Sequence, residues 1–448
     1  MKSPAEAQEA VQSLIERATR AGADGADAAY VGERSSSVTV RNGALEDVSR
    51  SEGERIGMRF LLGHRVAAAS TSDFSNASLD ALVERLAAMA REASEDPYAG
   101  LAPEELLLKG EPPALDLGDG LEPDPDALRT RALETEAAAL AVEGITNSSG
   151  ASASASGHVF ALATSHGFCG AFRSGGHGHS VSVIAGEGSA KERDYDWHSA
   201  RHLEDLKDPA EIGRLAGTRA AARLSPRPIR PGTYPILFDP RVATTLLGHL
   251  AGALSGAAVA RRSSFLQEKM GERIFAPGIR IVDDPLRDRG LRSHSFDGEG
   301  LPVERMDIVE DGVLQTWFAA SAAARQLGIA PTGHAIRGPA GSPGAGPSNF
   351  YLAAGEKSQA ELMASVPRAI LVTELIGHGV NGVTGDYSRG AAGFLVEGGE
   401  IVHPVSEITI ASNLTDMFAS LVPGSDLELW RGMDAPTLMV PEMTVASA

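Results

Sequence analysis

Residues 384–410 read TGDYSRGAAGFLVEGGEIVHPVSEITI. In this stretch, glycines, an acid, a tyrosine and an arginine stand between short runs of β-forming residues. Because glycine costs backbone entropy inside a helix, the stretch predicts tight turns and closely spaced strands. Just before it, residues 377–382 fit the pattern G-x-G-x-x-G. No amphipathic helix pattern follows these glycines, so they predict a turn rather than a dinucleotide site.

Composition limits the class of protein. The chain has 448 residues, 43% hydrophobic and 22% charged, which is enough to bury a large core. A net charge of −19 without a basic stripe argues against nucleic-acid binding. The single cysteine, Cys169, excludes an internal disulfide and a cysteine zinc cage. Because no signal-peptide core and no apolar run of about 18 residues occurs, we expect a cytoplasmic protein without membrane contact.

Periodic patterns and turn residues divide the chain into three units. Helical stripes at 6–21 and 78–93 flank several short β-like runs. Further β-like runs are predicted at 157–163, 167–174 and 179–185. The predicted fold class is α+β, with helix–antiparallel sheet–helix units followed by a large, mainly antiparallel β domain with few helices. The predicted divisions are an N-terminal α+β domain (1–100), a linker (101–125), a central α+β domain (126–228) and a C-terminal β-rich domain (229–448).

The C-terminal stretch also points to a family. Residues 384–410, with Asn413-Leu414 after them, resemble the C-terminal signature of the TldD/PmbA peptidase family, and specifically its PmbA (TldE) branch. The resemblance runs from the Asn42-Gly43 hairpin region to Met443-Thr444. It implies a subunit that pairs with a TldD-like subunit and encloses a chamber in which unfolded peptides are cut.

The same resemblance shows what this chain lacks. In the TldD branch, the helix after the first strand of the last domain carries a His-Glu-x-x-x-His zinc motif, and a cysteine near the C-terminus adds a ligand. Here His249 occupies the first histidine position, Leu250 replaces the glutamate that would act as general base, and Leu254 replaces the second histidine. One imidazole alone does not hold zinc. We therefore expect no metal and no catalytic residue in this chain, and zinc in the TldD partner.

Four residues of the glycine-rich region are candidates for lining the chamber and contacting an extended peptide. They are His378, Asn381, Asp386 and Arg389. The alternative for Asp386 and Arg389 is a structural one, in which buried charge pairs stabilise the turns.

Two other segments have compositions that suit a functional site. His177 and His179 would share a face of a strand, which suits a metal site, but the glycines beside them favour a polar, exposed hairpin. Residues 338–348 are rich in glycine and proline and predict a mobile loop. Such loops often cover functional sites, so a lid is one hypothesis.

Three functions remain open. The first is the non-metal subunit of a heterodimeric TldD/TldE-type metalloprotease that degrades or processes unfolded peptides. The second is a non-enzymatic binding or regulatory homodimer, of the gyrase-modulator type, that acts through protein partners. The third is an independent hydrolase that uses His249 or the His177/His179 pair with an unusual metal.

Overall fold

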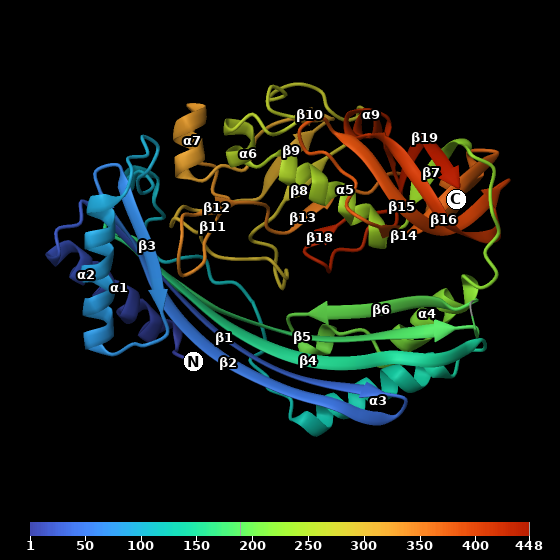
Figure 1. Cartoon of the computed structure of the whole chain (residues 1–448), viewed down its shortest axis with the longest axis horizontal. Coiled ribbons are helices and arrows are strands. Elements are labelled where there is room, and N and C mark those ends of the chain that lie inside the picture. The colour runs from blue at the N-terminus through green and yellow to red at the C-terminus, as the bar shows by residue number, and fades with distance from the viewer. Residues whose placement is uncertain (189, 448) are drawn as a thin grey trace.

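The computed structural model describes residues 1–188 and 190–447. Its N-terminal half forms one long curved sheet, and its C-terminal half lies over the concave face of that sheet (Figure 1). Helices of the N-terminal half cover the opposite, convex face. The α+β fold class predicted from the sequence is confirmed.

The N-terminal sheet has six strands in the order β3-β2-β1-β4-β5-β6. Antiparallel pairing of β1 with β4, from Asp27↔Thr164 to Val40↔Ala151, joins the two predicted N-terminal units into this single sheet. The predicted domain boundaries stay predictions. The strands are β1 (Gly25–Arg41), β2 (Ala44–Leu62), β3 (Arg65–Thr71), β4 (Ile145–Thr164), β5 (Cys169–Ala185) and β6 (Glu192–Ala200).

Two helix pairs bury the convex face. Even-numbered residues of β1 point to this face, so that Ala28 and Tyr30 pack under α1 and α2, and Val38 and Val40 pack under α3 and α4. Each helix begins at a serine or aspartate whose side chain accepts a backbone N–H of the first turn, which satisfies an otherwise unpaired donor. The helices are α1 (Pro4–Arg20), α2 (Asn76–Glu92), α3 (Pro125–Leu140) and α4 (Pro209–Ala222).

The C-terminal half is built around a small barrel. Its sheet has the order β16-β15-β14-β7-β19-β17, and pairing of β16 with β19 closes it. Among the described pairings of this sheet, β14–β7 alone is parallel. The strands are β7 (Gly232–Phe238), β14 (Arg368–Ile376), β15 (Asp386–Glu397), β16 (Glu400–Asn413), β17 (Val422–Pro423) and β19 (Leu438–Ser447).

Shorter elements complete this half. A second sheet has the order β10-β9-β8-β13-β18, and β11 pairs with β12. The strands are β8 (Ile281–Asp283), β9 (Met306–Glu310), β10 (Val313–Leu314), β11 (Ala335–Ile336), β12 (Gly344–Ala345), β13 (Phe350–Leu352) and β18 (Met433–Asp434). The helices are α5 (Pro240–Ala253), α6 (Gly256–Ala260), α7 (Ser321–Leu327), α8 (Gln359–Ala364) and α9 (Leu414–Ser420), and two short 3-10 helices span Glu104–Leu106 and Leu203–Asp205.

A buried ion cluster joins the two halves. Asp27 of β1 pairs with Arg59 on the neighbouring strand β2, with Arg59 Nε 3.0 Å from Asp27 Oδ2. Arg337 of the C-terminal half reaches the other carboxylate oxygen, with Nη2 2.6 Å from Oδ1. All three side chains are almost fully buried. Asp27 is thus the ion-pair partner of both cations across the contact between the halves, and the charge of the buried Glu299 acts on both from further away.

The glycine- and proline-rich loop begins beside this cluster. A Cβ built at Gly57 of β2 would lie 1.9 Å from the carbonyl oxygen of Pro339, so the loop backbone rests directly on the strand. Arg337 and Pro339 therefore hold the start of the loop against the N-terminal sheet. A lid movement of residues 338–348 stays a prediction.

A buried acid near the same contact gives a pH-dependence prediction. Asp297 accepts backbone N–H groups from Glu299, Leu301 and Ala335. Burial, followed by the nearby Glu299 carboxylate, raises the pKa of Asp297 to about 7. An unfolded aspartate releases its proton near pH 4. Between these values the unfolded chain binds fewer protons, so this group lowers the free energy of unfolding as pH rises from about 4 to 7.

Asp297→Asn removes that titration. We expect urea denaturation across pH 4–8 to show that the variant gains stability relative to the wild type as pH rises. The free energy of unfolding of the variant minus that of the wild type should increase up to about pH 7 and then stay constant. Taking the difference cancels the contribution of the histidines that titrate in the same pH range, because both proteins contain them. Parallel pH profiles for the two proteins would contradict the prediction.

Candidate functional site

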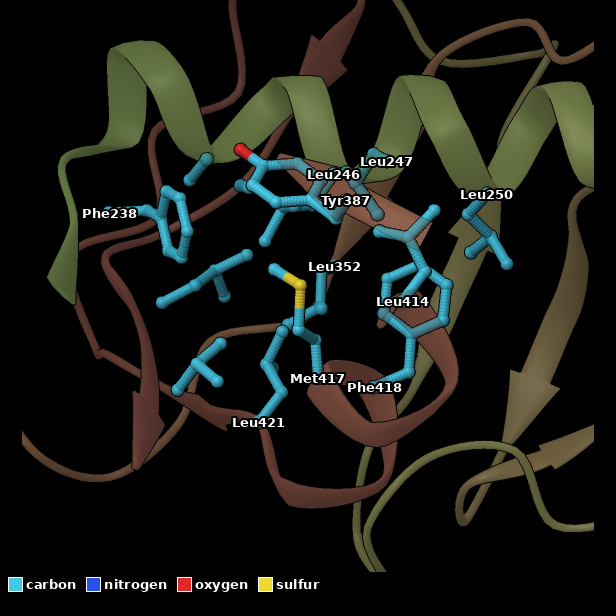
Figure 2. Packing of buried hydrophobic residues seen from close by; sticks show 14 of the residues in the cluster. Phe238, Leu246, Leu247, Leu250, Leu352, Tyr387, Leu414, Met417, Phe418 and Leu421 are labelled. Atoms are coloured by element: carbon cyan, nitrogen blue, oxygen red, sulfur yellow. The ribbon is translucent and has the colours of Figure 1, made fainter. Parts of the chain in front are cut away.

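Helix α5 carries the residues that correspond to the zinc motif. It follows β7 directly, and Asp239 caps it by accepting the N–H of Arg241 at 2.9 Å. Proline at its first position suits a helix start because the missing N–H would have had no partner there. A buried stripe then fixes the helix against α9 and Tyr387 (Figure 2). The stripe comprises Val242, Ala243, Leu246, Leu247, Leu250 and Ala253.

The three motif positions have different surroundings. Leu250 and Leu254 are fully buried in the hydrophobic core, and Leu250 packs beside Leu414 (Figure 2). His249 is only partly buried and lines a cavity instead. His249 thus lines a pocket, whereas Leu250 and Leu254 belong to the core.

The cavity beside His249 holds about 370 Å³. His378 and Arg389 contribute polar groups from the loop before β15 and from β15 itself. The remaining lining residues are mostly small or apolar; they are Gly248, Gly252, Ala253, Ser263, Phe265, Val380, Gly382 and Leu414. Three sequence candidates, His249, His378 and Arg389, therefore lie around one cavity.

The other two candidates shape the loop. The backbone N–H of Asn381 donates to the carbonyl of Asp386 at 2.9 Å, and the Asn381 side chain accepts the N–H of Val383. Asp386 accepts the hydroxyl of Thr384 at 2.6 Å. Neither Asn381 nor Asp386 lines the cavity. These hydrogen bonds hold the turn, but they are not the buried charge pairs of the structural alternative, because Asp386 is exposed and has no ion pair with Arg389 among the described residues.

The cavity is cationic. No aspartate or glutamate is among its described lining residues, whereas Arg389 is. His249 Nε2 and Arg389 Nε are buried and have no hydrogen-bond partner among the described residues. Burial, and then the charge of Arg389, lowers the pKa of His249, so its ring is neutral near pH 7. The ring of Tyr387 packs edge-on against His249 at 6.0 Å and fixes its orientation.

These groups do not fit zinc. Structural and catalytic zinc sites use three or four imidazole, carboxylate or thiolate ligands. This pocket offers two imidazoles beside a guanidinium that repels a cation. Within residues 1–188 and 190–447, no cluster of three or more His, Cys, Asp or Glu is arranged to hold a metal ion.

Comparison with known proteins shows the family to which this chain belongs. Models of the PmbA/TldA metallopeptidase match in succession: domain 1 over residues 26–90, the central domain over 118–224 and the C-terminal domain over 231–447. The Metalloprotease PmbA of Escherichia coli O157:H7 is 38% identical over 441 residues, which covers 98% of this chain and 96% of that protein. The chain belongs to the PmbA/TldD metallopeptidase family. The resemblance noted in the sequence is confirmed.

Solved structures of PmbA/TldD-like proteins share the fold. A Bacteroides thetaiotaomicron protein, described as a candidate modulator of DNA gyrase, superposes with a TM-score of 0.91 at 27% identity, covering 99% of both chains. TldE from Thermococcus kodakarensis gives a TM-score of 0.85 over 98% of this chain and 100% of its own, at 21% identity. The second likeness concerns the fold alone.

The histidine pair of this PmbA/TldD-family chain is not exposed, and the prediction of an exposed hairpin is wrong. His177 and His179 lie within β5 and are buried on the convex face. His177 Nε2 lies 2.9 Å from a carboxylate oxygen of Asp119 in the segment before α3. Burial lowers the pKa of His179 to about 4. The glycines nearby indicated a turn, but pairing of β5 on both edges keeps the strand extended.

The concave face of the sheet carries a row of serines that was not predicted as a functional surface. On β4, Ala151, Ala153 and Ala155 point to the helices, so Ser152, Ser154 and Ser156 point to the concave face. Facing positions on β1 and β5 are also serine, threonine or glycine. The six-residue alternation of alanine and serine is the signal that predicts this hydroxyl-rich surface.

Part of that face forms a larger cavity of about 740 Å³. Glu33, Ser35, Arg55 and His158 are among its polar lining residues, and Pro339 of the glycine-rich loop lies at its border. None of the helices described here has both the length and the apolar character that a bilayer crossing requires.

Proposed function

We propose that this chain is the non-metal subunit of a two-subunit peptidase and acts with a zinc-bearing relative in the cytoplasm. The observation that carries the proposal is the pocket on α5. Leu250 and Leu254 are core residues, and the pocket beside His249 is lined by Arg389 and by no carboxylate or thiolate among the described residues. The catalytic ion would come from the partner.

The role of this subunit in the pair would be to bind an unfolded peptide. The concave face offers hydroxyl groups and glycine backbone, which suit contacts with any extended peptide. Residues 44–55 of β2 pair only with β1, so the outer edge of this segment has no strand partner among the described residues. Main-chain pairing at such an edge gives affinity without strong sequence preference.

A reconstitution experiment tests the proposal. The purified chain is mixed with the zinc-bearing relative from the same organism, and complex size, bound zinc and cleavage of an unfolded peptide are measured. We expect a stable complex with chelator-sensitive cleavage, while the chain alone has substoichiometric zinc and no cleavage. A homodimer that ignores the relative would instead favour the regulatory alternative. Cleavage by the chain alone with one zinc bound would favour the independent hydrolase.

A further inference from the structure

The proposed function assigns no ligand to the cationic pocket on α5. Most buried arginines in this chain contact a carboxylate, as Arg59 does with Asp27 and Arg241 with Asp194. Arg389 has no carboxylate within 4.0 Å among the described residues, although its Nε is buried. A buried guanidinium N–H normally has an acceptor. The pocket therefore presents an unused donor in a site free of competing acids.

We propose that this pocket binds the terminal carboxylate of an extended peptide. The identification of the ligand as a peptide rests on the proposed function, whereas the affinity for a carboxylate rests on the pocket itself. Arg389 supplies the charge, because guanidinium groups form charge-assisted hydrogen bonds with carboxylates. His249 is neutral and donates from Nε2–H to the same group.

The size and the walls of the pocket favour a peptide end over a larger anion. A volume of about 370 Å³ is at the low end for ligand pockets. Phe265, Val380 and Leu414 add apolar side chains to the lining. One arginine and a neutral imidazole match one negative charge. A carboxylate with one adjoining apolar side chain therefore fits, and the rest of the peptide would extend out of the pocket.

Edge-on packing of Tyr387 against His249 fixes the orientation of the imidazole that would contact the carboxylate. Tyr387 is 1% exposed and its ring lies 6.0 Å from that of His249 at an interplanar angle of 78°. Burial raises the pKa of the Tyr387 phenol against the opposing effect of Arg389. Tyr387 therefore stays neutral and acts as a positioning residue.

Binding to the purified chain tests the proposal without any partner subunit. A fluorescent hexapeptide that ends in leucine is compared with the same peptide amidated at its C-terminus. We expect the free acid to bind about tenfold more tightly or better, since a charge-assisted pair is lost in the amide. Equal affinities would overturn the proposal.

Variants identify the site. Arg389→Ala should abolish the preference for the free acid, whereas Arg214→Ala, which removes an exposed arginine on α4, should keep it. If Arg389→Ala does not fold, an NMR titration of wild-type His249 replaces it. The free acid should raise the pKa of His249 and the amide should not. An acid preference that survives in folded Arg389→Ala, or a pKa of His249 that both peptides leave unchanged, would overturn the assignment.

A competition experiment distinguishes a peptide from a free anion as the ligand of the pocket. Inorganic phosphate is added to the bound free-acid peptide. Displacement only at a large excess of phosphate supports a peptide site. Displacement at concentrations comparable to the peptide would assign the pocket to a free oxyanion and overturn the peptide ligand. Because no cleavage is measured, failure here is distinguishable from failure of the two-subunit proposal.

Discussion

Asp27→Ala is expected to lower the free energy of unfolding by about 3–5 kcal/mol, because it leaves two buried arginines without an ion-pair partner and with only the more distant charge of Glu299. Asp27 is 2% exposed and contacts both Arg59 and Arg337. Although burial alone would raise the pKa of Asp27, Arg337 and Arg59 together lower it to about 2. Urea denaturation near pH 7 measures the loss.

The matched control is Asp80→Ala, which removes an exposed ion pair between α2 and Arg17. Exposed pairs contribute about 0–1 kcal/mol, so this change should be small. A second readout uses pH. Because the folded pKa is below the unfolded value near 4, the contribution of Asp27 is present above pH 4 and is lost as pH falls toward 2. Equal losses in the two variants would contradict the role of the cluster in joining the halves.

Local patterns were sufficient for the helices of the N-terminal half but not for its strands. The stripes at 6–21 and 78–93 match α1 and α2 closely, because caps and apolar spacing are local features. The predicted strands at 157–163 and 179–185 are only parts of β4 and β5. Serine, alanine and glycine have weak strand preference, and these segments are extended because they pair with neighbours on both edges.

The pocket illustrates what spacing cannot predict. His249, His378 and Arg389 were each candidates, but their meeting depends on how His249 of α5 packs against Tyr387 of β15. The pairing of Asp27 with Arg337 likewise joins residues from opposite halves of the chain. Such contacts follow from tertiary packing, and no period or motif in one segment encodes them.

Leu250→Glu is expected to lower the free energy of unfolding by more than about 3 kcal/mol, and it should not create a peptidase. The change would restore the His-Glu pair of the zinc motif in the sequence. Leu250 is fully buried among hydrophobic side chains such as Leu414, so a glutamate there would be an unpaired charge in the core (Figure 2). Thermal and urea denaturation measure the effect, and zinc content and peptide cleavage test for activity.

Leu250→Met is the control, because it conserves volume and apolar character and should cost less than about 1.5 kcal/mol. The comparison separates charge burial from any general intolerance of α5 to substitution. A folded Leu250→Glu variant with an unchanged melting temperature would show that this side of α5 can open to water. Zinc-dependent cleavage by that variant alone would show that the pocket tolerates a metal despite Arg389. Under the proposed function, the expected inactivity of the chain alone would then follow from the leucine at position 250 rather than from the surrounding cationic pocket.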